Sequence, residues 1–421
     1  MKKEKPFQNY TLRDFTLTNL LTNAVDRSIQ FRKWIAQSEY NNHDIFWMEA
    51  QGAIRPEMYL KDRRSGEAKE VISFISNDYL GMSQRPETIL AGIEGVLTYG
   101  TGACAAPIIG GYMDIHKQLE QELARFTGQE DALIFSSGFG VNVGVLNALL
   151  GKEDIAFIDL QVHSSVLDGL HKTNVKKVGH NNPEYLEFAL KNERHKYKTA
   201  IVIIDGIYSQ DGDMAPLPEI KAVCEKYDAL LYVDDAHGIG VFGDNGRGIV
   251  EHYNMLGQVD IITGTLSKSF GAVGGFIACS KDMASYLRYH ANTNVFSASP
   301  TPQVTFSVLK ALELLQADKS ICRKLWDNVN YLRTRLTEEG FDIGHSVSPI
   351  FPIMVRDPYK VLEVTRLLKE RGIYAIGITF PAVTNKDSRV RASVLASHEK
   401  KHLDKFVTAL NEIDRILKLK P

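Results

Sequence analysis

The sequence predicts an α/β protein built on a mainly parallel β-sheet, followed by a smaller α+β part near the C-terminal end. Two observations lead to this prediction. From about residue 70, short apolar runs alternate with amphipathic stretches of helical spacing. The runs are apolar throughout rather than at every second residue, which is typical of strands buried on both faces of a parallel sheet. We therefore expect helices to cover the sheet on both sides.

The elements follow in order along the chain. Apolar positions at helical spacing between residues 11 and 40 predict an N-terminal helical segment that packs on the body of the protein or on a partner subunit. The strands that we expect next are 71–75, 132–135, 155–158, 200–205, 230–234, 260–263 and 275–278. The helices that we expect between them are 113–126, 142–150, 183–191 and 217–226.

The pattern changes after the segment Pro300-Thr301-Pro302. Helical spacing continues over 304–315 and 321–339, and strands near 350–355 and 389–394 enclose a helix at 360–371. We therefore divide the chain into three parts. These are an N-terminal helical or extended segment (1–75), a large domain (76–305) and a small C-terminal domain (306–421).

Composition excludes several classes of function. The formal net charge is −2 and there is no basic tail, so we expect no nucleic-acid partner. No apolar run approaches the ~20 residues that cross a bilayer, and no apolar stretch of a signal peptide follows the N-terminus, so we expect a cytoplasmic protein. Peripheral contact with a membrane stays open. The cysteines are Cys104, Cys224, Cys279 and Cys322. Their spacing is that of neither a disulfide framework nor a zinc site.

The first chemical signal is Lys268. It follows an apolar run, 259–262, and lies among small residues in the segment 263–271. Burying an ammonium group costs several kcal/mol unless the group is paired or neutralised. An uncharged lysine at a strand end serves well as a nucleophile that forms an imine. The alternative is a surface lysine in a loop of serine and glycine.

A second signal is an anion loop at 134–142. An apolar run ends in Ser-Ser-Gly, and a helix begins at once. Free amide groups at a helix N-terminus, with hydroxyl groups beside them, suit a phosphate. The same residues also form ordinary turns, so this signal is weak on its own.

A third signal is the pair Asp234 and His237 in the segment 232–238. A carboxylate at the end of a buried strand needs a cation or hydrogen-bond donors. A protonated pyridine nitrogen would satisfy Asp234, and His237 could donate to a phenolic oxygen of the same ring. An Asp-x-x-His metal site is one alternative, although no third ligand is evident. A structural salt bridge or cap is another.

A fourth signal is His163, just after the run that ends at Asp159. Its imidazole could lie flat on an aromatic cofactor, although such a histidine is also common in ordinary loops. Together these four signals provide partners for each part of one planar, phosphorylated aldehyde. We therefore expect pyridoxal 5′-phosphate (PLP) as the cofactor, and no metal.

The chain resembles the α-oxoamine synthases, PLP enzymes with the aspartate-aminotransferase fold (fold type I), over roughly residues 70–415. The motifs that carry the resemblance are SNDYLG (76–81), YGTG (99–102), FSSGF (135–139), DGIYS (205–209), VDDAH (233–237), GTLSK (264–268) and FSAS (296–299). The resemblance implies a large domain with a mainly parallel seven-stranded sheet and a smaller C-terminal α+β domain. It also implies a homodimer with shared active sites.

Matched position by position, the resemblance assigns roles to single residues. Lys268 would form the Schiff base with the cofactor and later move the α-proton. Asp234 would face the pyridine nitrogen, His237 the phenolic oxygen, and His163 would stack on the ring. The cofactor-binding residues that it implies are Ser137, Gly138, Phe139, His163, Ser209, Asp234, His237, Thr265, Lys268 and Ser299, the last reaching the phosphate of the neighbouring subunit.

The resemblance also implies an acyltransferase reaction. An amino acid would condense with an acyl thioester, carried by coenzyme A or an acyl-carrier protein, with loss of carbon dioxide. Asn77 and Arg391 match positions that bind the α-carboxylate, and arginine binds a carboxylate with two hydrogen bonds. Arg389 lies at period two from Arg391, so the sequence does not by itself say which arginine faces the site.

Within the family, the chain most resembles bacterial serine palmitoyltransferases, which favours serine, a long-chain acyl thioester and a role in sphingolipid synthesis. One departure is Ala105-Ala106-Pro107, where those enzymes carry Gly-Ser-Arg. Cysteate, which gives a sulfonolipid base, is a second choice, and a glycine acyltransferase or an 8-amino-7-oxononanoate synthase is a third. An aminotransferase and a catalytically silent partner subunit are further alternatives.

Overall fold

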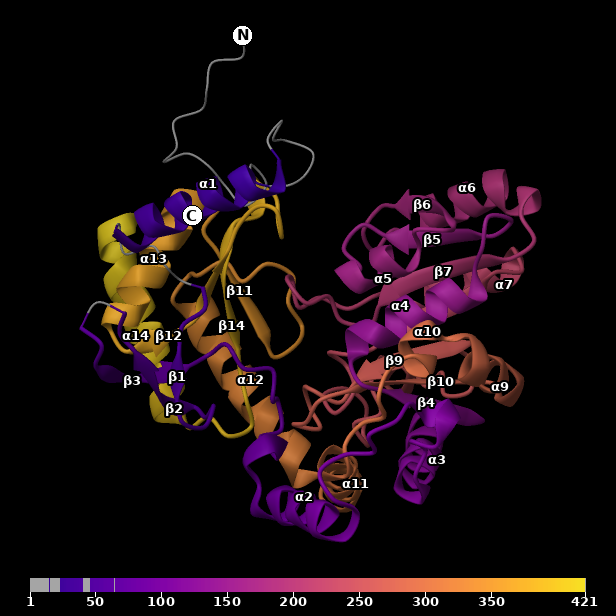
Figure 1. Ribbon diagram of the computed structural model, residues 1–421. Helices are drawn as coiled ribbons and strands as arrows, with labels where there is room; N and C mark the ends of the chain where they lie inside the picture. Colours follow the sequence, from indigo (N-terminus) through magenta and orange to yellow (C-terminus); the bar gives the residue numbers. More distant parts are fainter. Residues whose placement is uncertain (1–14, 16–22, 41–45, 64, 421) are drawn as a thin grey trace. The chain divides into compact units, whose positions relative to one another are not determined.

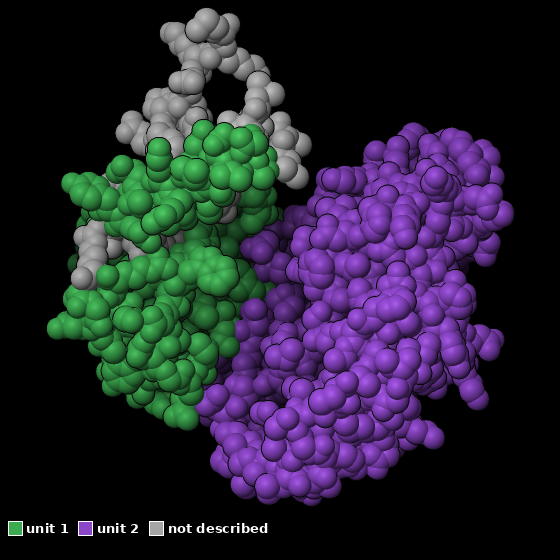
Figure 2. Space-filling view, viewed as in Figure 1, with its two compact units in different colours: residues 1–76, 328–394, 398–421 green, residues 77–327, 395–397 purple. Residues whose placement is uncertain are grey.

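The computed structural model describes residues 15, 23–40, 46–63 and 65–420. The chain forms two compact units, which Figure 2 colours separately. The smaller unit comprises residues 1–76, 328–394 and 398–421, and the larger unit comprises residues 77–327 and 395–397. In the described part of the chain, none of the helices has the length and apolar character needed to span a membrane.

The larger unit contains a seven-stranded sheet in the order β4-β10-β9-β8-β7-β5-β6 (Figure 1). Strands β5 to β9 pair in parallel, whereas β10 is antiparallel to both of its neighbours. The strands are β4 (Asp131–Phe135), β5 (Ile155–Asp159), β6 (Asn174–Val178), β7 (Ala200–Asp205), β8 (Leu230–Asp234), β9 (Ile261–Thr265) and β10 (Gly275–Cys279).

The apolar runs form the inner strands, as predicted. Every residue of β5, β7, β9 and β10 is buried, which is why these strands do not alternate in polarity. The run 71–75 overlaps β3, which pairs with β2 and β12 in the smaller unit. One strand of the large sheet was not predicted. It is β6, an edge strand in which Lys177 is exposed and Lys176 is half-buried, so it lacks an apolar run.

Helices pack around the sheet of the larger unit (Figure 1). The helices of this unit are α2 (Pro86–Tyr99), α3 (Asp114–Thr127), α4 (Gly138–Leu149), α5 (Ser164–Gly169), α6 (Pro183–Glu193), α7 (Leu217–Lys226), α8 (Ile249–His252), α9 (Lys281–His290), α10 (Asn292–Val295) and α11 (Pro302–Ala317), with 3-10 turns η3 (Met82–Gln84), η4 (Pro107–Ile109) and η5 (Arg194–Lys196). Apolar residues of α4, α5 and α9 pack on the sheet in one continuous core.

The division of the chain differs from the sequence-based boundary near residue 305. That boundary falls inside α11, which packs closely along α2 within the larger unit. A Cβ atom on Gly92 would lie 2.7 Å from Ser307 Oγ, and one on Gly95 would lie 2.7 Å from the Pro302 carbonyl oxygen. The two glycines therefore permit the close approach. The division falls instead at residues 327 and 328, within α12 (Ser320–Glu338).

The smaller unit combines two sheets with helices. Its four-stranded sheet has the order β1-β2-β3-β12, and its three-stranded sheet has the order β11-β14-β13. Its elements are α1 (Ala24–Tyr40), β1 (Ala50–Gln51), β2 (Glu57–Lys61), β3 (Ala68–Ser73), β11 (Ile350–Met354), α13 (Pro358–Glu370), β12 (Ile373–Tyr374), β13 (Ile376–Ile378), η6 (Asn385–Asp387), β14 (Arg389–Ser393) and α14 (Lys400–Leu417). The predicted N-terminal helix is α1 over Ala24–Tyr40, and the rest of the stretch 11–40, except Phe15, lies outside the described residues.

One edge of the large sheet gathers the polar residues. Because β10 is antiparallel to both β4 and β9, strand β4 runs in the same direction as the parallel strands. The carboxyl ends of β4, β5, β7, β8 and β9 therefore meet at one edge. Ligands of open α/β sheets bind outside this edge, where loops lead from strands into helices.

Candidate active site

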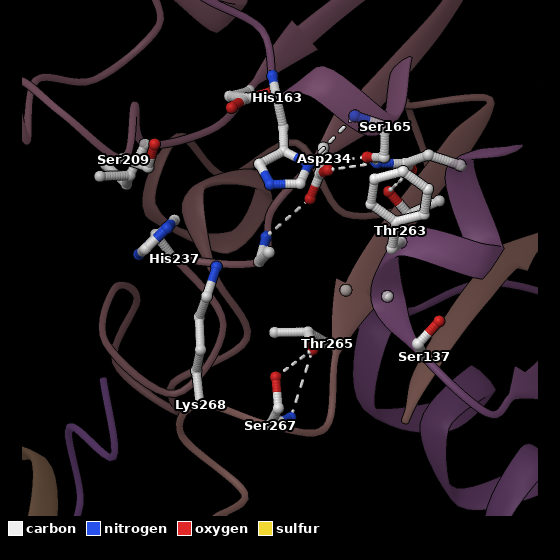
Figure 3. Close-up of a pocket in the computed structure, with 17 residues that line it drawn as sticks. Ser137, His163, Ser165, Ser209, Asp234, His237, Thr263, Thr265, Ser267 and Lys268 are labelled. Atoms are coloured by element: carbon white, nitrogen blue, oxygen red, sulfur yellow. Dashed lines mark hydrogen bonds between the residues drawn. The ribbon is translucent and has the colours of Figure 1, made fainter. Parts of the chain in front are cut away.

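A cavity of about 290 Å³ opens at this edge of the larger unit (Figure 3). Segments that follow β4, β5, β7, β8 and β9 all contribute to its lining. The lining residues are Ser137, Gly138, Phe139, Asn142, His163, Ser165, Asp205, Ile207, Ser209, Asp234, Ala236, His237, Thr263, Gly264, Thr265, Ser267 and Lys268. The volume is close to the lower end of ~300–1,000 Å³ that small-molecule sites occupy.

Helix α4 begins at the cavity and supplies an anion site. Ser137 is its N-cap, and the Ser137 hydroxyl accepts a hydrogen bond from the Gly140 N–H at 2.9 Å. Amide groups of a first helical turn have no acceptor inside the helix, so they are available to an anion. A Cβ on Gly138 would lie 3.1 Å from both the Cβ and Oγ1 of Thr265. Glycine thus leaves a shallow cradle between the helix and the Thr265 hydroxyl.

The two neighbouring aspartates of the VDDAH segment have different surroundings. Asp234 lines the cavity, and its Oδ1 accepts a hydrogen bond from the Ala236 N–H at 3.2 Å. Asp235 is fully buried, and burial raises the pKa of its carboxyl well above the ordinary value. A Cβ on Gly238 or Gly248 would lie within 2.0 Å of its oxygens. Asp235 therefore fills a space that glycines leave for it, while Asp234 faces the cavity.

Asn142, on α4, joins Asp234 to the rest of the site. Its Nδ2 donates to Asp234 Oδ2 at 2.7 Å and to Ser165 Oγ at 2.8 Å. Its Oδ1 accepts from the Tyr232 hydroxyl at 2.6 Å and from Thr263 Oγ1 at 3.3 Å. Every polar atom of this buried amide therefore has a partner, which holds the Asp234 carboxylate in one orientation.

His163 lies above Lys268 in the cavity as drawn in Figure 3. Its Nδ1 is 2.7 Å from Ser165 Oγ, and its backbone N–H donates to Asp205 Oδ1 at 3.3 Å. Burial lowers the pKa of His163 and Lys268 lowers it further, although the Asp234 carboxylate opposes both. Burial and the neighbouring Asp234 raise the pKa of Asp205 well above its ordinary value.

His237 contacts a buried tyrosine that the sequence interpretation did not single out. The Tyr79 hydroxyl lies 2.8 Å from His237 Nδ1 and 3.4 Å from Asn77 Oδ1. Tyr79 has no exposed surface, and only 7% of His237 is exposed. The contact uses Nδ1 of the imidazole, so Nε2 remains the nitrogen that can reach a ligand.

Lys268 follows β9 and extends into the cavity (Figure 3). The segment before it is held by Thr265, whose Oγ1 lies 2.7 Å from Ser267 Oγ and donates to the Gly274 carbonyl at 3.0 Å. The Lys268 carbonyl accepts from the Gly271 N–H at 2.8 Å, which closes the turn. Lys268 therefore lies on a turn that is closed by hydrogen bonds, beside the anion cradle.

The cavity brings together most of the residues that the sequence singled out. Ser137, Gly138, Phe139, His163, Ser209, Asp234, His237, Thr265 and Lys268 all line it. Ser299 lies outside the lining, buried in the larger unit, and its Oγ has no hydrogen-bond partner among the described residues. Asn77 belongs to the larger unit, whereas Arg391 and Arg389 are both buried on β14 of the smaller unit.

The sequence interpretation missed Asn142, Ser165, Asp205, Thr263 and Tyr79. Asp205 ends an apolar run just as Asp234 does, and this pattern could have indicated it. The others carry no local signal, because a buried amide or hydroxyl is recognisable only from its partners. Among the described residues, no three His, Cys, Asp or Glu side chains gather as a metal ion would require.

The cavity fits PLP by its chemistry. One cavity is lined by an anion-binding cradle, a carboxylate, an imidazole and a primary amine. These groups match the phosphate, the pyridine nitrogen, the ring face and the aldehyde of that cofactor. The fold and the site thus define a PLP-dependent enzyme of fold type I.

Comparisons with known proteins specify the family. A family model described as aminotransferase class I and II matches residues 69–410. An 8-amino-7-oxononanoate synthase from Alkaliphilus metalliredigens is 40% identical over 353 residues, 83% of this chain and 89% of the relative. A serine palmitoyltransferase from Bacteroides ovatus is 40% identical over 352 residues, with the same coverage of 83% and 89%.

Solved structures agree with this family. A serine palmitoyltransferase from Sphingomonas wittichii superposes with a TM-score of 0.88 at 28% identity, covering 96% of this chain and all of that one. One from S. paucimobilis, with bound PLP and myriocin, gives 0.88 at 28% identity over 94% of this chain. The chain belongs to the class I and II aminotransferase family and, within it, to the α-oxoamine synthases, which are PLP-dependent acyltransferases.

Proposed function

We propose that this α-oxoamine synthase condenses serine with a long-chain acyl thioester, releasing carbon dioxide and the free thiol. The observation that supports the reaction is the cavity, where an amine, a carboxylate and an imidazole surround the space for one cofactor ring. When bound, PLP supplies an electron-withdrawing ring that accepts the electron pair left at the substrate Cα. The residues around it then hold the cofactor and move protons.

Each side chain has a role that its contacts permit. Lys268 Nζ holds the cofactor covalently and later carries the proton of the substrate Cα, a task worth about 10²–10⁴-fold for a positioned base. Asp234, fixed by Asn142 and the Ala236 N–H, keeps the ring nitrogen protonated. His237, held by Tyr79 at Nδ1, donates from Nε2 to the phenolic oxygen.

The phosphate contacts come from the start of α4 and its neighbours. Ser137, Gly138, Phe139 and Thr265 would hold the phosphate in the cradle described above, and Ser209 would add a hydroxyl. For the amino acid, Asn77 of the larger unit would contribute to binding of the α-carboxylate.

The choice of a long apolar acyl chain rests on the segment 101–112. This segment contains no charged residue, and it exposes Ile108 and Ile109, the latter by 76%. Its Ala105 carbonyl accepts from the Ser299 N–H at 3.2 Å, which places it beside a residue proposed to contact the phosphate. An apolar chain gains from such a surface, whereas a carboxylated chain would need a cation.

Synthesis of 8-amino-7-oxononanoate is the second candidate, favoured by the 40% identity to the Alkaliphilus enzyme. The carbon skeleton of that product requires alanine and a seven-carbon acyl group that ends in a carboxylate. The two candidates thus differ in both the amino acid and the acyl group. Cysteate and glycine are further amino acids that the same reaction could accept.

One assay separates these substrates. We would incubate the PLP-loaded protein with serine, alanine, cysteate or glycine, each with palmitoyl-CoA or pimeloyl-CoA, and measure free thiol and product mass. We expect serine with palmitoyl-CoA to give the highest kcat/KM, and Lys268→Ala to release no thiol with any pair. Preference for alanine with pimeloyl-CoA would refute the serine proposal and support the second candidate. Absence of thiol release with every pair would argue against the condensation itself.

We further propose that the enzyme acts as a homodimer in which Ser299 contacts the phosphate bound by the partner. A buried hydroxyl without a partner costs stability, and the Ser299 Oγ is such a group among the described residues. Helix α2 also exposes an apolar stripe of Ile89, Leu90, Ile93 and Leu97. We expect light scattering to give twice the mass of the chain, and Ser299→Ala to bind PLP more weakly. A monomer with full PLP affinity would contradict both expectations.

A further inference from the structure

A chain of buried hydrogen bonds leads from the core of the large sheet to His163. The Tyr232 hydroxyl donates to Asn142 Oδ1 at 2.6 Å, and Asn142 Nδ2 donates to Ser165 Oγ at 2.8 Å. Ser165 Oγ in turn lies 2.7 Å from His163 Nδ1. Tyr232 and Ser165 are fully buried, and Asn142 is 2% exposed. Each hydrogen atom along this chain therefore needs a protein acceptor.

The orientation of the Asn142 amide follows from its neighbours. One of its terminal atoms lies 2.7 Å from Asp234 Oδ2, and a carboxylate oxygen only accepts hydrogen bonds. That atom must be the nitrogen, because an amide oxygen there would oppose the carboxylate. The oxygen then faces the hydroxyl groups of Tyr232 and Thr263, both of which can donate. The two Asn142 N–H groups thus go to Asp234 and Ser165.

This orientation fixes the direction of the next bond. Ser165 Oγ accepts from Asn142, and it has a single hydrogen to donate. His163 Nδ1, 2.7 Å away, is the acceptor within reach. The Ser165 backbone N–H also points to the same Nδ1, at 3.3 Å. A proton on Nδ1 would face both of these donors and would leave the buried serine hydrogen without a partner.

We propose that Asn142 and Ser165 are positioning residues that hold His163 as a neutral imidazole with its proton on Nε2. The same amide orients Asp234, so one side chain of α4 sets both the carboxylate and the imidazole of the site. The charged and titratable groups that face His163 are Lys268, Asp205 and Asp234. The lowered pKa of His163, due first to burial, agrees with a neutral ring.

A neutral His163 suits a site that holds a positively charged ring. An imidazolium over a protonated pyridine would bring two like charges together in a partly buried cavity, which is unfavourable. The neutral ring instead presents an uncharged face and one N–H donor at Nε2. The identity of the facing ring rests on the proposed function, but the tautomer follows from the hydrogen bonds of the chain alone.

The tautomer can be read directly by NMR without any turnover. We would label the histidines of the full-length, deuterated protein with ¹⁵N and record long-range ¹H–¹⁵N correlations with and without PLP, assigning His163 by its loss in His163→Gln. We expect a pyridine-type Nδ1 and a pyrrole-type Nε2 at neutral pH in both forms. A protonated Nδ1, in either the other tautomer or the imidazolium, would overturn the proposal, whatever substrate the enzyme uses.

Variants then test Ser165, the positioning residue that contacts His163 directly. In Ser165→Ala we expect His163 to show a mixture of both tautomers and kcat to fall about tenfold, as for loss of one buried hydrogen bond. Ser165→Thr keeps the hydroxyl and should restore the single tautomer. Asn147→Ala removes an amide of the same helix whose Nδ2 donates to the Val143 carbonyl, so it is the matched control and should leave the His163 signals unchanged. An unaltered His163 spectrum in Ser165→Ala would show that this relay does not set the tautomer.

Discussion

His180 is held between two carboxylates, and its replacement should destabilise the protein in a pH-dependent way. Its Nδ1 lies 2.9 Å from Asp159 Oδ1 and its Nε2 lies 2.8 Å from Asp213 Oδ2. Burial alone would disfavour the charged ring, but Asp159 and Asp213 outweigh it and raise the pKa of His180 to about 10. Asp159 is 3% exposed, and its carboxylate contacts His180 and accepts hydrogen bonds from the N–H groups of Gln161 and Asn181.

The sign of the pH dependence follows from the raised pKa. An unfolded histidine has a pKa of about 6.5, so the stabilisation is fully present below that pH and is lost as the pH rises towards about 10. This difference in pKa corresponds to at most about 5 kcal/mol. Because 24% of the side chain is exposed, solvent screens the pair, and we expect about 2–3 kcal/mol.

The perturbation is His180→Gln, which keeps one possible hydrogen bond but removes the charge. We would compare the thermal midpoints of the PLP-loaded wild type and variant from pH 6 to pH 10.5. We expect the variant to melt about 2–4 °C lower at pH 6 and the difference to shrink steadily above about pH 6.5. His195→Gln, at an exposed position, is the matched control and should change little. A difference that stays constant across this pH range would refute a charged His180.

Further predictions concern the cavity. Lys268→Ala should keep the far-UV spectrum but lose the visible absorbance of lysine-bound PLP; retained absorbance would remove Lys268 from its role. Asp234→Asn should lower kcat by about 10²–10³-fold while PLP still binds, and an unchanged kcat would mean that another group protonates the ring nitrogen. Tyr79→Phe should lower kcat about tenfold and shift the pH–rate profile by freeing His237 Nδ1, and an unchanged profile would contradict this contact. Gly275→Ala should weaken PLP binding measured by fluorescence, because the added Cβ would lie 2.5 Å from Gly138 Cα. An unaltered affinity would show that the backbone of the cradle can shift to accommodate it.

The buried strands were predictable because burial on both faces leaves a mark in the sequence. Strands β5, β7, β8 and β9 coincide with the apolar runs of the sequence. Strand β6 was not predictable, because an edge strand needs no apolar run and carries Lys176 and Lys177. The run 71–75 was predicted as a strand without neighbours, since apolar character indicates burial but does not identify the neighbouring strand.

The candidate site was predictable where a reactive side chain lies at or shortly after the end of a strand. Asp234 ends β8, and Lys268 and His163 lie shortly after β9 and β5. The order of the strands brings these ends to one side of the sheet. Asn142 was not predictable, because its side chain donates to Ser165, 23 positions away, and to Asp234, 92 positions away. Ser165 was not predictable because its role depends on that same bond from Asn142.

The sequence by itself determined the class of fold and the cofactor, because strand burial and reactive side chains are local properties of the chain, and its resemblance to the α-oxoamine synthases indicated the type of reaction. Only the tertiary structure decided which of Asp234 and Asp235 faces the cavity, because glycines from separate segments enclose the second carboxylate. It also decided the partners of His163 and His237. Tyr79, which contacts His237, is 158 positions away in the sequence, and Asn142, which donates to the Ser165 hydroxyl beside His163, is 23 positions from that serine, so only folding brings these groups together.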